Sequence, residues 1–163
     1  MVESQFPFRQ RNARAIVDTV LLHSTAVPDL NATMAVLSKR GLSYHFLVDR
    51  DGVTVQLVDP MFVAFHAGDS NGPQGPACNE YSVGISFVNL NDGVDPYTKA
   101  QLASLTSLVD LLRIQIPTLR FLTTHQAVSA PRKDDPRNFP IQQCAELCGL
   151  EIWTRSGVPV VIP

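Results

Sequence analysis

Apolar residues in this chain fall into short continuous runs separated by polar segments. Runs at residues 16–22, 83–88 and 119–124 are each six or seven residues long, with few polar interruptions. Continuous runs of this length are typical of strands that are buried on both faces of a sheet. We therefore expect three central strands at these positions.

Two further apolar runs, at residues 44–48 and 54–58, flank the polar segment 49–52, which ends in Asp-Gly. An Asp-Gly pair between two apolar runs is a strong signal for a β-hairpin. This pair of strands must therefore be antiparallel.

Other segments repeat their apolar residues every three or four positions, as amphipathic helices do. The clearest helix has Thr98 and Gln101 at the spacing of a capping box, and another has Asn31 as its expected cap and Gly41 as its stop. The predicted helices are 31–40, 98–116 and 141–147.

Strands that alternate with helices predict an α/β domain with a central mixed β-sheet of about five to six strands, flanked by helices. We expect residues 1–163 to form a single domain with a core at about 16–148, an N-terminal extension at 1–15 and a tail at 149–163. Residues 59–80 are rich in Gly and Pro and form a long connection. Connections of this length in a compact domain are usually functional.

Composition narrows the classes of function. The chain has 163 residues, 45% of them hydrophobic, and a formal net charge of -2. This charge argues against a nucleic-acid partner, and no apolar run approaches the roughly 20 residues of a membrane span. The polar N-terminus does not resemble a secretory signal, so we expect cytoplasmic synthesis. We also expect that the protein has no membrane anchor and is a monomer. The odd number of cysteines, three, predicts thiols rather than a disulfide framework.

Two histidines provide the candidate chemistry. His23 and His125 each follow a predicted buried strand, and such strand ends meet at the rim of a sheet where ligands bind. Two imidazoles and one carboxylate form the ligand set of a catalytic zinc site. Asp134 and Asp135 both lie near His125, and spacing alone does not separate them. The sequence thus predicts a zinc (Zn2+) site at the sheet rim.

Five motifs in this order resemble those of the type 2 N-acetylmuramoyl-L-alanine amidases. That family includes phage endolysins, cytosolic muropeptide-recycling (AmpD-like) amidases and animal peptidoglycan recognition proteins. The motifs are 20–26 (VLLHSTA), 43–48 (SYHFLV), 65–70 (FHAGDS), 79–85 (NEYSVGI) and 125–136 (HQAVSAPRKDDP).

The resemblance implies roles for individual residues. The three zinc ligands of the family match His23, His125 and Asp135, which favours Asp135 over Asp134. The lysine that stabilises the transition state in the family matches Lys133. A catalytic tyrosine of the phage enzymes matches Tyr44. The implied reaction is hydrolysis of the amide between the lactyl group of N-acetylmuramic acid and L-alanine.

One position departs from the family. The recycling enzymes carry a glutamate, proposed as general base, where this chain has Ser86, and serine does not accept a proton at neutral pH. The resemblance leaves the base open between Tyr44 and the water activated by zinc. We expect His66 either to contact substrate or to brace the long connection. Asn79 is the other candidate substrate residue, and we expect it to order this connection rather than to react. His45 follows Tyr44 and should point to the opposite face of their strand.

These observations favour a phage-type endolysin that degrades peptidoglycan of the cell wall. The alternative is a cytosolic amidase that recycles anhydro-muropeptides, which residues 74–79 favour and Ser86 opposes. A peptidoglycan-binding module without catalysis is a third possibility, which Asp135 opposes, because modules of that kind lose the third ligand.

Overall fold

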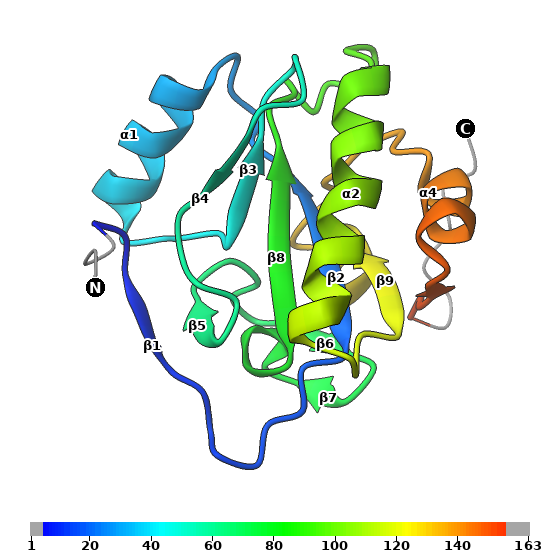
Figure 1. The fold of residues 1–163 in the computed structure, drawn as a ribbon. Coiled ribbons are helices and arrows are strands. Elements are labelled where there is room, and N and C mark those ends of the chain that lie inside the picture. The colour runs from blue at the N-terminus through cyan, green and yellow to red at the C-terminus, as the bar shows by residue number, and fades with distance from the viewer. Residues whose placement is uncertain (1–4, 156–163) are drawn as a thin grey trace.

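The computed structural model describes residues 5–155, which form one α/β domain around a six-stranded mixed sheet (Figure 1). The strand order is β10-β9-β2-β8-β3-β4, and all neighbouring pairs are parallel except the β3–β4 hairpin. The strands of this sheet are β2 (Thr19–Ser24), β3 (Phe46–Val48), β4 (Thr54–Gln56), β8 (Ser82–Phe87), β9 (Phe121–Thr124) and β10 (Glu151–Ile152). The predicted fold class is confirmed. Parts of the expected N-terminal extension and tail, 1–4 and 156–163, lie outside the described residues.

The long connection contains short elements of its own. Strand β5 (Phe62–Ala64) pairs antiparallel with β1 (Phe8–Gln10), and β6 (Asn71–Gly72) pairs with β7 (Gly75–Pro76). The 3-10 helix η1 (Cys78–Glu80) then leads into β8. This segment lies across the lower end of the sheet in Figure 1, where β5, β6 and β7 gather.

The helices are α1 (Leu30–Arg40), α2 (Lys99–Gln115), α3 (His125–Ser129) and α4 (Ile141–Cys148). The expected capping box at Thr98 and Gln101 is present, and Gly41 ends α1 with a φ of 62°. The expectation that Asn31 caps α1 is wrong. Asp29 is the cap, because its carboxylate accepts a hydrogen bond from the Ala32 amide at 2.8 Å and so ties down a free amide of the first turn.

Helices cover both faces of the sheet. On one face α2 and α4 pack on a continuous apolar core that includes Val83, Ile85 and Phe87 of β8. On the opposite face the apolar contacts divide into two clusters, one under α1 around Leu47 and one under α3 around Leu21. The space between these two clusters holds the imidazoles.

Strand β3 is shorter than the predicted run 44–48, and this changes one expectation. Tyr44 and His45 precede the strand, where side chains no longer alternate between faces. Both rings lie on the same side, with centroids 6.4 and 5.6 Å from the centroid of His66. The expectation that His45 points away from Tyr44 is therefore wrong.

The N-terminal segment is held in place by the half-buried guanidinium of Arg11. The guanidinium of Arg11 donates hydrogen bonds at 2.8–3.2 Å to the backbone carbonyls of Pro60, Asn79, Glu80 and Ser82. Burial lowers the pKa of Arg11 to about 10, and the carboxylate of Glu80 opposes the shift. Arg11 thus holds residues 59–82 in place from behind the site.

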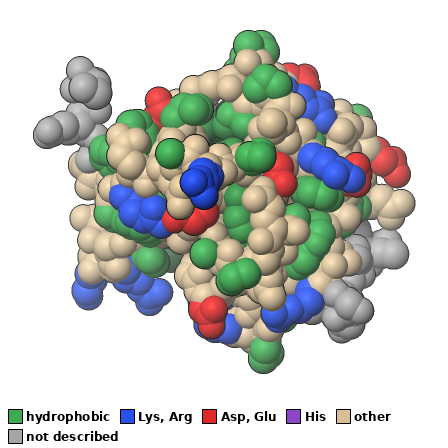
Figure 2. Space-filling view, turned by 90° about the horizontal axis from the view of Figure 1, so that it is seen from below, with side chains coloured by type: hydrophobic (Ala, Val, Ile, Leu, Met, Phe, Trp, Pro, Cys, Tyr) green, Lys and Arg blue, Asp and Glu red, His purple; other side chains and the backbone are tan. Residues whose placement is uncertain are grey.

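The surface mixes charges of both signs. In Figure 2, basic and acidic side chains alternate with apolar ones, and no histidine is visible on the face shown. All four histidines are in fact buried. Within residues 5–155, no helix has the length and apolarity that a membrane span requires.

Candidate metal centre

Three predicted ligands converge at the rim of the sheet. His23 lies near the end of β2, His125 begins α3 directly after β9, and Asp135 lies in the loop that follows α3. All three are buried, and one ligand atom from each lies within 4.8 Å of the others. Parallel strands β2 and β9 are neighbours in the sheet, so their ends bring residues 102 positions apart into contact.

The distances between these atoms suit a tetrahedral metal ion. The Nδ1 atoms of His23 and His125 are 3.1 Å apart, and Asp135 oxygens lie 3.1 Å from His125 Nδ1 and 3.5 Å from His23 Nδ1. With zinc–ligand bonds of about 2.0–2.1 Å, the atoms of a tetrahedral site lie roughly 3.3 Å apart. Two imidazoles and a carboxylate therefore fit zinc in both chemistry and spacing.

The tautomer of His125 supports this fit. Its Nε2 lies 3.1 Å from the carbonyl oxygen of Ala67, which only accepts hydrogen bonds, so Nε2 carries the proton. The Nδ1 lone pair then faces the carboxylate of Asp135. An unprotonated nitrogen opposite a carboxylate favours a cation between them.

Electrostatics around the cluster keep the His23 imidazole neutral and the Asp135 carboxylate ionised. Burial, and then the neighbouring His125, lower the pKa of His23 to about 4. Burial alone would raise the pKa of Asp135, but the neighbouring His125 and His23 rings hold it well below its usual range. Neutral imidazole and ionised carboxylate are the forms that bind metal.

The structure separates the two candidate aspartates. Asp134 is exposed and pairs with the guanidinium of Arg137, and its other oxygen accepts a hydrogen bond from Asn91. Asp135 points inward, where one oxygen lies 3.3 Å from the backbone amide of Ser24. Only Asp135 joins the two histidines in the cluster.

Two members of the cluster, His125 and Asp135, line a cleft of about 440 Å³, large enough for a small peptide or sugar. One wall comes from α1 and Leu42, the other from Gly68 and residues 131–134. Lys133 and Tyr44 both line this cleft, together with the ligands His125 and Asp135. The ring centroid of Tyr44 is 4.9 Å from that of His23.

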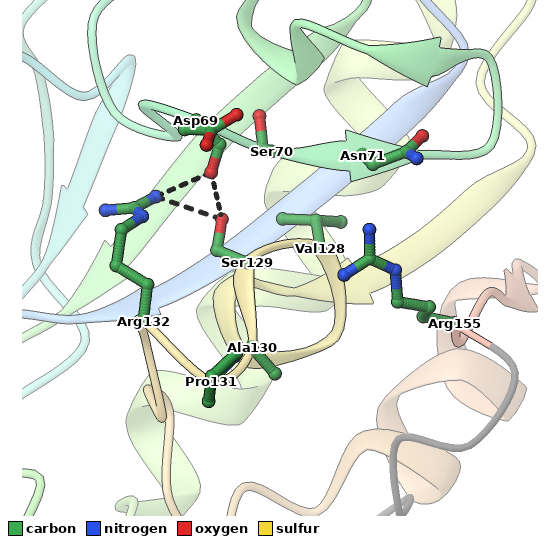
Figure 3. Close-up of a pocket in the computed structure, with 9 residues that line it drawn as sticks. All are labelled: Asp69, Ser70, Asn71, Val128, Ser129, Ala130, Pro131, Arg132 and Arg155. Carbon is green, nitrogen blue, oxygen red and sulfur yellow. Dashed lines mark hydrogen bonds between the residues drawn. The ribbon is translucent and has the colours of Figure 1, made fainter.

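Arg132 stabilises the wall that carries Lys133. Its guanidinium donates to the carbonyl oxygens of Ala67 and Asp69, both at 2.8 Å, and to the hydroxyl of Ser129 at 3.1 Å. Figure 3 shows this group beside a second cavity of about 200 Å³, which shares Pro131 and Arg132 with the cleft. Sequence reasoning missed Arg132, although it directly precedes Lys133.

The two predicted substrate residues are differently placed. His66 is largely buried but lines the cleft, and its Nδ1 lies 3.0 Å from His23 Nε2. The amide oxygen of Asn79 accepts hydrogen bonds from the backbone amides of His66 and Ala67, at 3.2 and 2.8 Å. Asn79 therefore braces the loop that carries His66. Contact of either residue with substrate stays a prediction.

Comparisons with known proteins agree with this geometry. Residues 12–138 match the family model described as N-acetylmuramoyl-L-alanine amidase. A 1,6-anhydro-N-acetylmuramyl-L-alanine amidase, AmpD, of Salmonella typhimurium is 34% identical over 119 residues, which are 71% of this chain and 62% of that protein. The chain thus spans less than two thirds of the length of the curated relatives it matches.

Two solved structures are similar over most of the chain. AmiD of E. coli, in complex with anhydro-N-acetylmuramic acid-L-Ala-D-gamma-Glu-L-Lys, has a TM-score of 0.69 at 27% identity and covers 87% of this chain and 62% of its own. The amidase LysC of Clostridium intestinale has a TM-score of 0.72 at 21% identity and covers 93% of this chain and 95% of its own. At that identity the likeness to LysC shows the fold alone.

Proposed function

This chain belongs to the N-acetylmuramoyl-L-alanine amidase family, and from this premise we propose that it is a zinc-dependent amidase. It hydrolyses the amide that joins the lactyl group of N-acetylmuramic acid to L-alanine of the stem peptide. The observation that carries the proposal is the convergence of His23, His125 and Asp135, the last two of which line a cleft.

The three ligands would hold zinc, which supplies Lewis acidity for the scissile carbonyl and for an attacking water. The other residues then act on charge that develops in the reaction. Lys133 lines the cleft next to the ligand loop, so its ammonium can stabilise the oxyanion of a tetrahedral intermediate. It is the residue that we propose for this role.

Tyr44 is better suited to donate a hydrogen bond than to accept a proton. Burial and the Asp135 carboxylate raise the pKa of Tyr44, and the nearby Ser86 hydroxyl opposes the shift only in part. The phenol therefore stays protonated at neutral pH. We propose that it orients the water or the oxyanion through its hydroxyl.

Soluble anhydro-muropeptides are the substrate class that we propose. The sequence motifs left this substrate class as the alternative to an endolysin, and the comparisons support it better than the endolysin hypothesis. The curated AmpD relatives are named for 1,6-anhydro-N-acetylmuramyl-L-alanine, and AmiD was solved with an anhydro-muropeptide. The endolysin hypothesis keeps support from LysC, which matches nearly end to end, but only at the level of fold.

A direct assay tests both parts of the proposal. Purified protein with one zinc per chain should release peptides with a free L-alanine amino terminus from an anhydro-muropeptide. A chelator should abolish the release, and added zinc should restore it. Faster release from intact sacculi than from the soluble substrate would favour the endolysin hypothesis. If the zinc-loaded protein cleaves neither substrate, the amidase proposal is wrong.

Other expectations stay predictions. These are the single-domain boundary at 1–163, a monomeric state, cytoplasmic synthesis and the lack of a nucleic-acid partner. The proposed partner is the muropeptide substrate itself.

A further inference from the structure

The two ring nitrogens of His23 face different partners. Nδ1 faces His125 and Asp135, the other members of the candidate metal centre. Nε2 faces the opposite way and lies 3.0 Å from Nδ1 of His66. The Nδ1 of His23 can bind metal only if it is unprotonated, so the proton of the neutral ring must lie on Nε2.

The direction of the His23–His66 hydrogen bond follows from the groups behind it. The Ser82 hydroxyl donates to the carbonyl of Cys78 at 2.6 Å, so its oxygen offers a lone pair to His66. His66 Nε2 lies 3.5 Å from that oxygen and carries the proton of the ring. Nδ1 of His66 is then the acceptor for the N–H of His23. The donor and the acceptor are thereby fixed for each hydrogen bond in the series that runs from Cys78 to the metal centre.

The backbone is shaped to hold His66 in this place. Strand β8 presents Gly84 under the imidazole, and a Cβ at that position would lie 2.6 Å from the His66 ring. No side chain is tolerated there without moving His66. The Asn79 amide oxygen accepts a hydrogen bond from the backbone amide of His66 and so fixes the backbone there. Two independent features therefore aim the ring at His23.

We propose that His66 is a positioning residue of the metal centre, which fixes the tautomer and the orientation of His23 by accepting its Nε2 proton. This inference rests on the zinc site of the proposed function. It assigns His66 to support of a ligand, in place of the substrate contact or loop bracing expected from sequence. Partners of this kind typically change metal affinity 10–100-fold when they are lost.

His45 offers a matched control. It is as fully buried as His66 and packs against its ring, but its nitrogens contact backbone groups and the guanidinium of Arg11 rather than a metal ligand. Nδ1 accepts from the Gly84 amide at 2.8 Å, and Nε2 lies 3.0 Å from the carbonyl of Phe62. Loss of His45 removes a buried imidazole without removing a partner of a metal ligand.

The experiment measures zinc affinity by competition with a chelator for the wild type, His66→Leu, His66→Asn and His45→Leu. We expect the zinc dissociation constant of His66→Leu to rise about 10–100-fold. His66→Asn keeps an oxygen near the position of Nδ1 and should recover most of the affinity. His45→Leu, although less stable, should bind zinc as the wild type does. In muropeptide assays, excess zinc should restore His66→Leu activity with an unchanged KM.

A measurement on the wild type keeps the test independent of folding of the variants. Long-range ¹H–¹⁵N NMR spectra of the zinc-loaded protein report which ring nitrogen carries the proton. His23, His66 and His125 should all be protonated on Nε2. A proton on Nδ1 of His66, or a raised KM in His66→Leu with unchanged zinc affinity, would overturn the inference. A wild-type protein that binds no zinc would instead reject the metal centre on which it rests.

Discussion

The two faces of the central sheet are equally buried but differ in what they bury. Strand β8 shows this within six residues. Val83, Ile85 and Phe87 point to α2 and join a continuous apolar core, whereas Ser82, Gly84 and Ser86 point to the other face. The small side chains of that face leave room for imidazoles. Burial alone therefore does not distinguish a packing position from a site position, and the size and polarity of alternate residues do.

The two faces are also held together by different forces. On the α2 face, contacts between apolar side chains supply the stability. On the site face, Arg11 donates hydrogen bonds to backbone carbonyls and Asn79 accepts hydrogen bonds from backbone amides, and these bonds join the segments that carry the site. We therefore expect substitutions on one face to change stability and substitutions on the other to change metal binding and activity.

The largest effect should come from loss of a ligand on the site face. Asp135→Ala removes the only carboxylate of the cluster, so we expect hydrolysis to fall on the order of 10⁴-fold, or roughly 5 kcal/mol. Zinc should no longer copurify at one ion per chain. Asp134→Ala is the control, because Asp134 pairs with Arg137, and its zinc content should not change. Full zinc content in Asp135→Ala would show that another residue is the third ligand.

The second-largest effect should come from the α2 face, where a substitution should lower stability but leave zinc binding unchanged. Phe87 is fully buried against Phe139 and Tyr97. Truncation of a buried Phe to Ala typically costs about 3–5 kcal/mol, which for a chain of this length lowers Tm by roughly 10 °C. Calorimetry of Phe87→Ala checks this, and zinc titration of the folded protein should match the wild type. A large loss of zinc affinity in the folded variant would contradict the division between the faces.

Sequence patterns predicted the elements of the α2 face well, because local sequence signals and the burial of apolar residues indicate the same secondary structure there. The capping box at Thr98, the apolar stripe of α2 and the three central strands are all present, with ends shifted by at most three residues. Strand β2 begins at Thr19 rather than at residue 16 because Ile16 is 58% exposed and lies outside the sheet.

The site face was predicted less completely, because its contacts join distant segments. Family motifs identified the residues that converge in the candidate ligand cluster. No local pattern indicated that His66 would contact His23, 43 positions away, or that Arg11 would donate hydrogen bonds to carbonyls of residues 59–82. The short helix α3 was also missed, since five residues provide no helical period.

A smaller effect should appear as pH dependence of stability. Burial, with Arg11 nearby, lowers the pKa of His45 to about 3, although its bond to Phe62 opposes the shift. Between about pH 6.5 and 3 the unfolded chain binds this proton and the folded chain does not, so stability is complete above 6.5 and falls as pH decreases. One such histidine contributes a slope of up to about 1.4 kcal/mol per pH unit.

Urea unfolding of the metal-free protein between pH 7 and 5 measures this slope. His45→Gln should be less stable at pH 7 but should lose less stability on acidification than the wild type. Equal slopes in the two proteins would mean that His45 is protonated in the folded state. The site face would then tolerate buried charge, contrary to its hydrogen-bond pattern.

The smallest effect should come from Ser86, which shares β8 with Phe87 but lies on the other face. Its hydroxyl is buried and has no hydrogen-bond partner of normal geometry among residues 5–155. An unpaired buried hydroxyl is costly, so Ser86→Ala should leave stability unchanged or raise it by up to about 1 kcal/mol. Hydrolysis should stay within about threefold of the wild type, because serine cannot act as a base at neutral pH. A tenfold loss of kcat would instead place Ser86 in the proton path through Tyr44, and residues of β8 on the site face would then take part in the chemistry as well as make room for it.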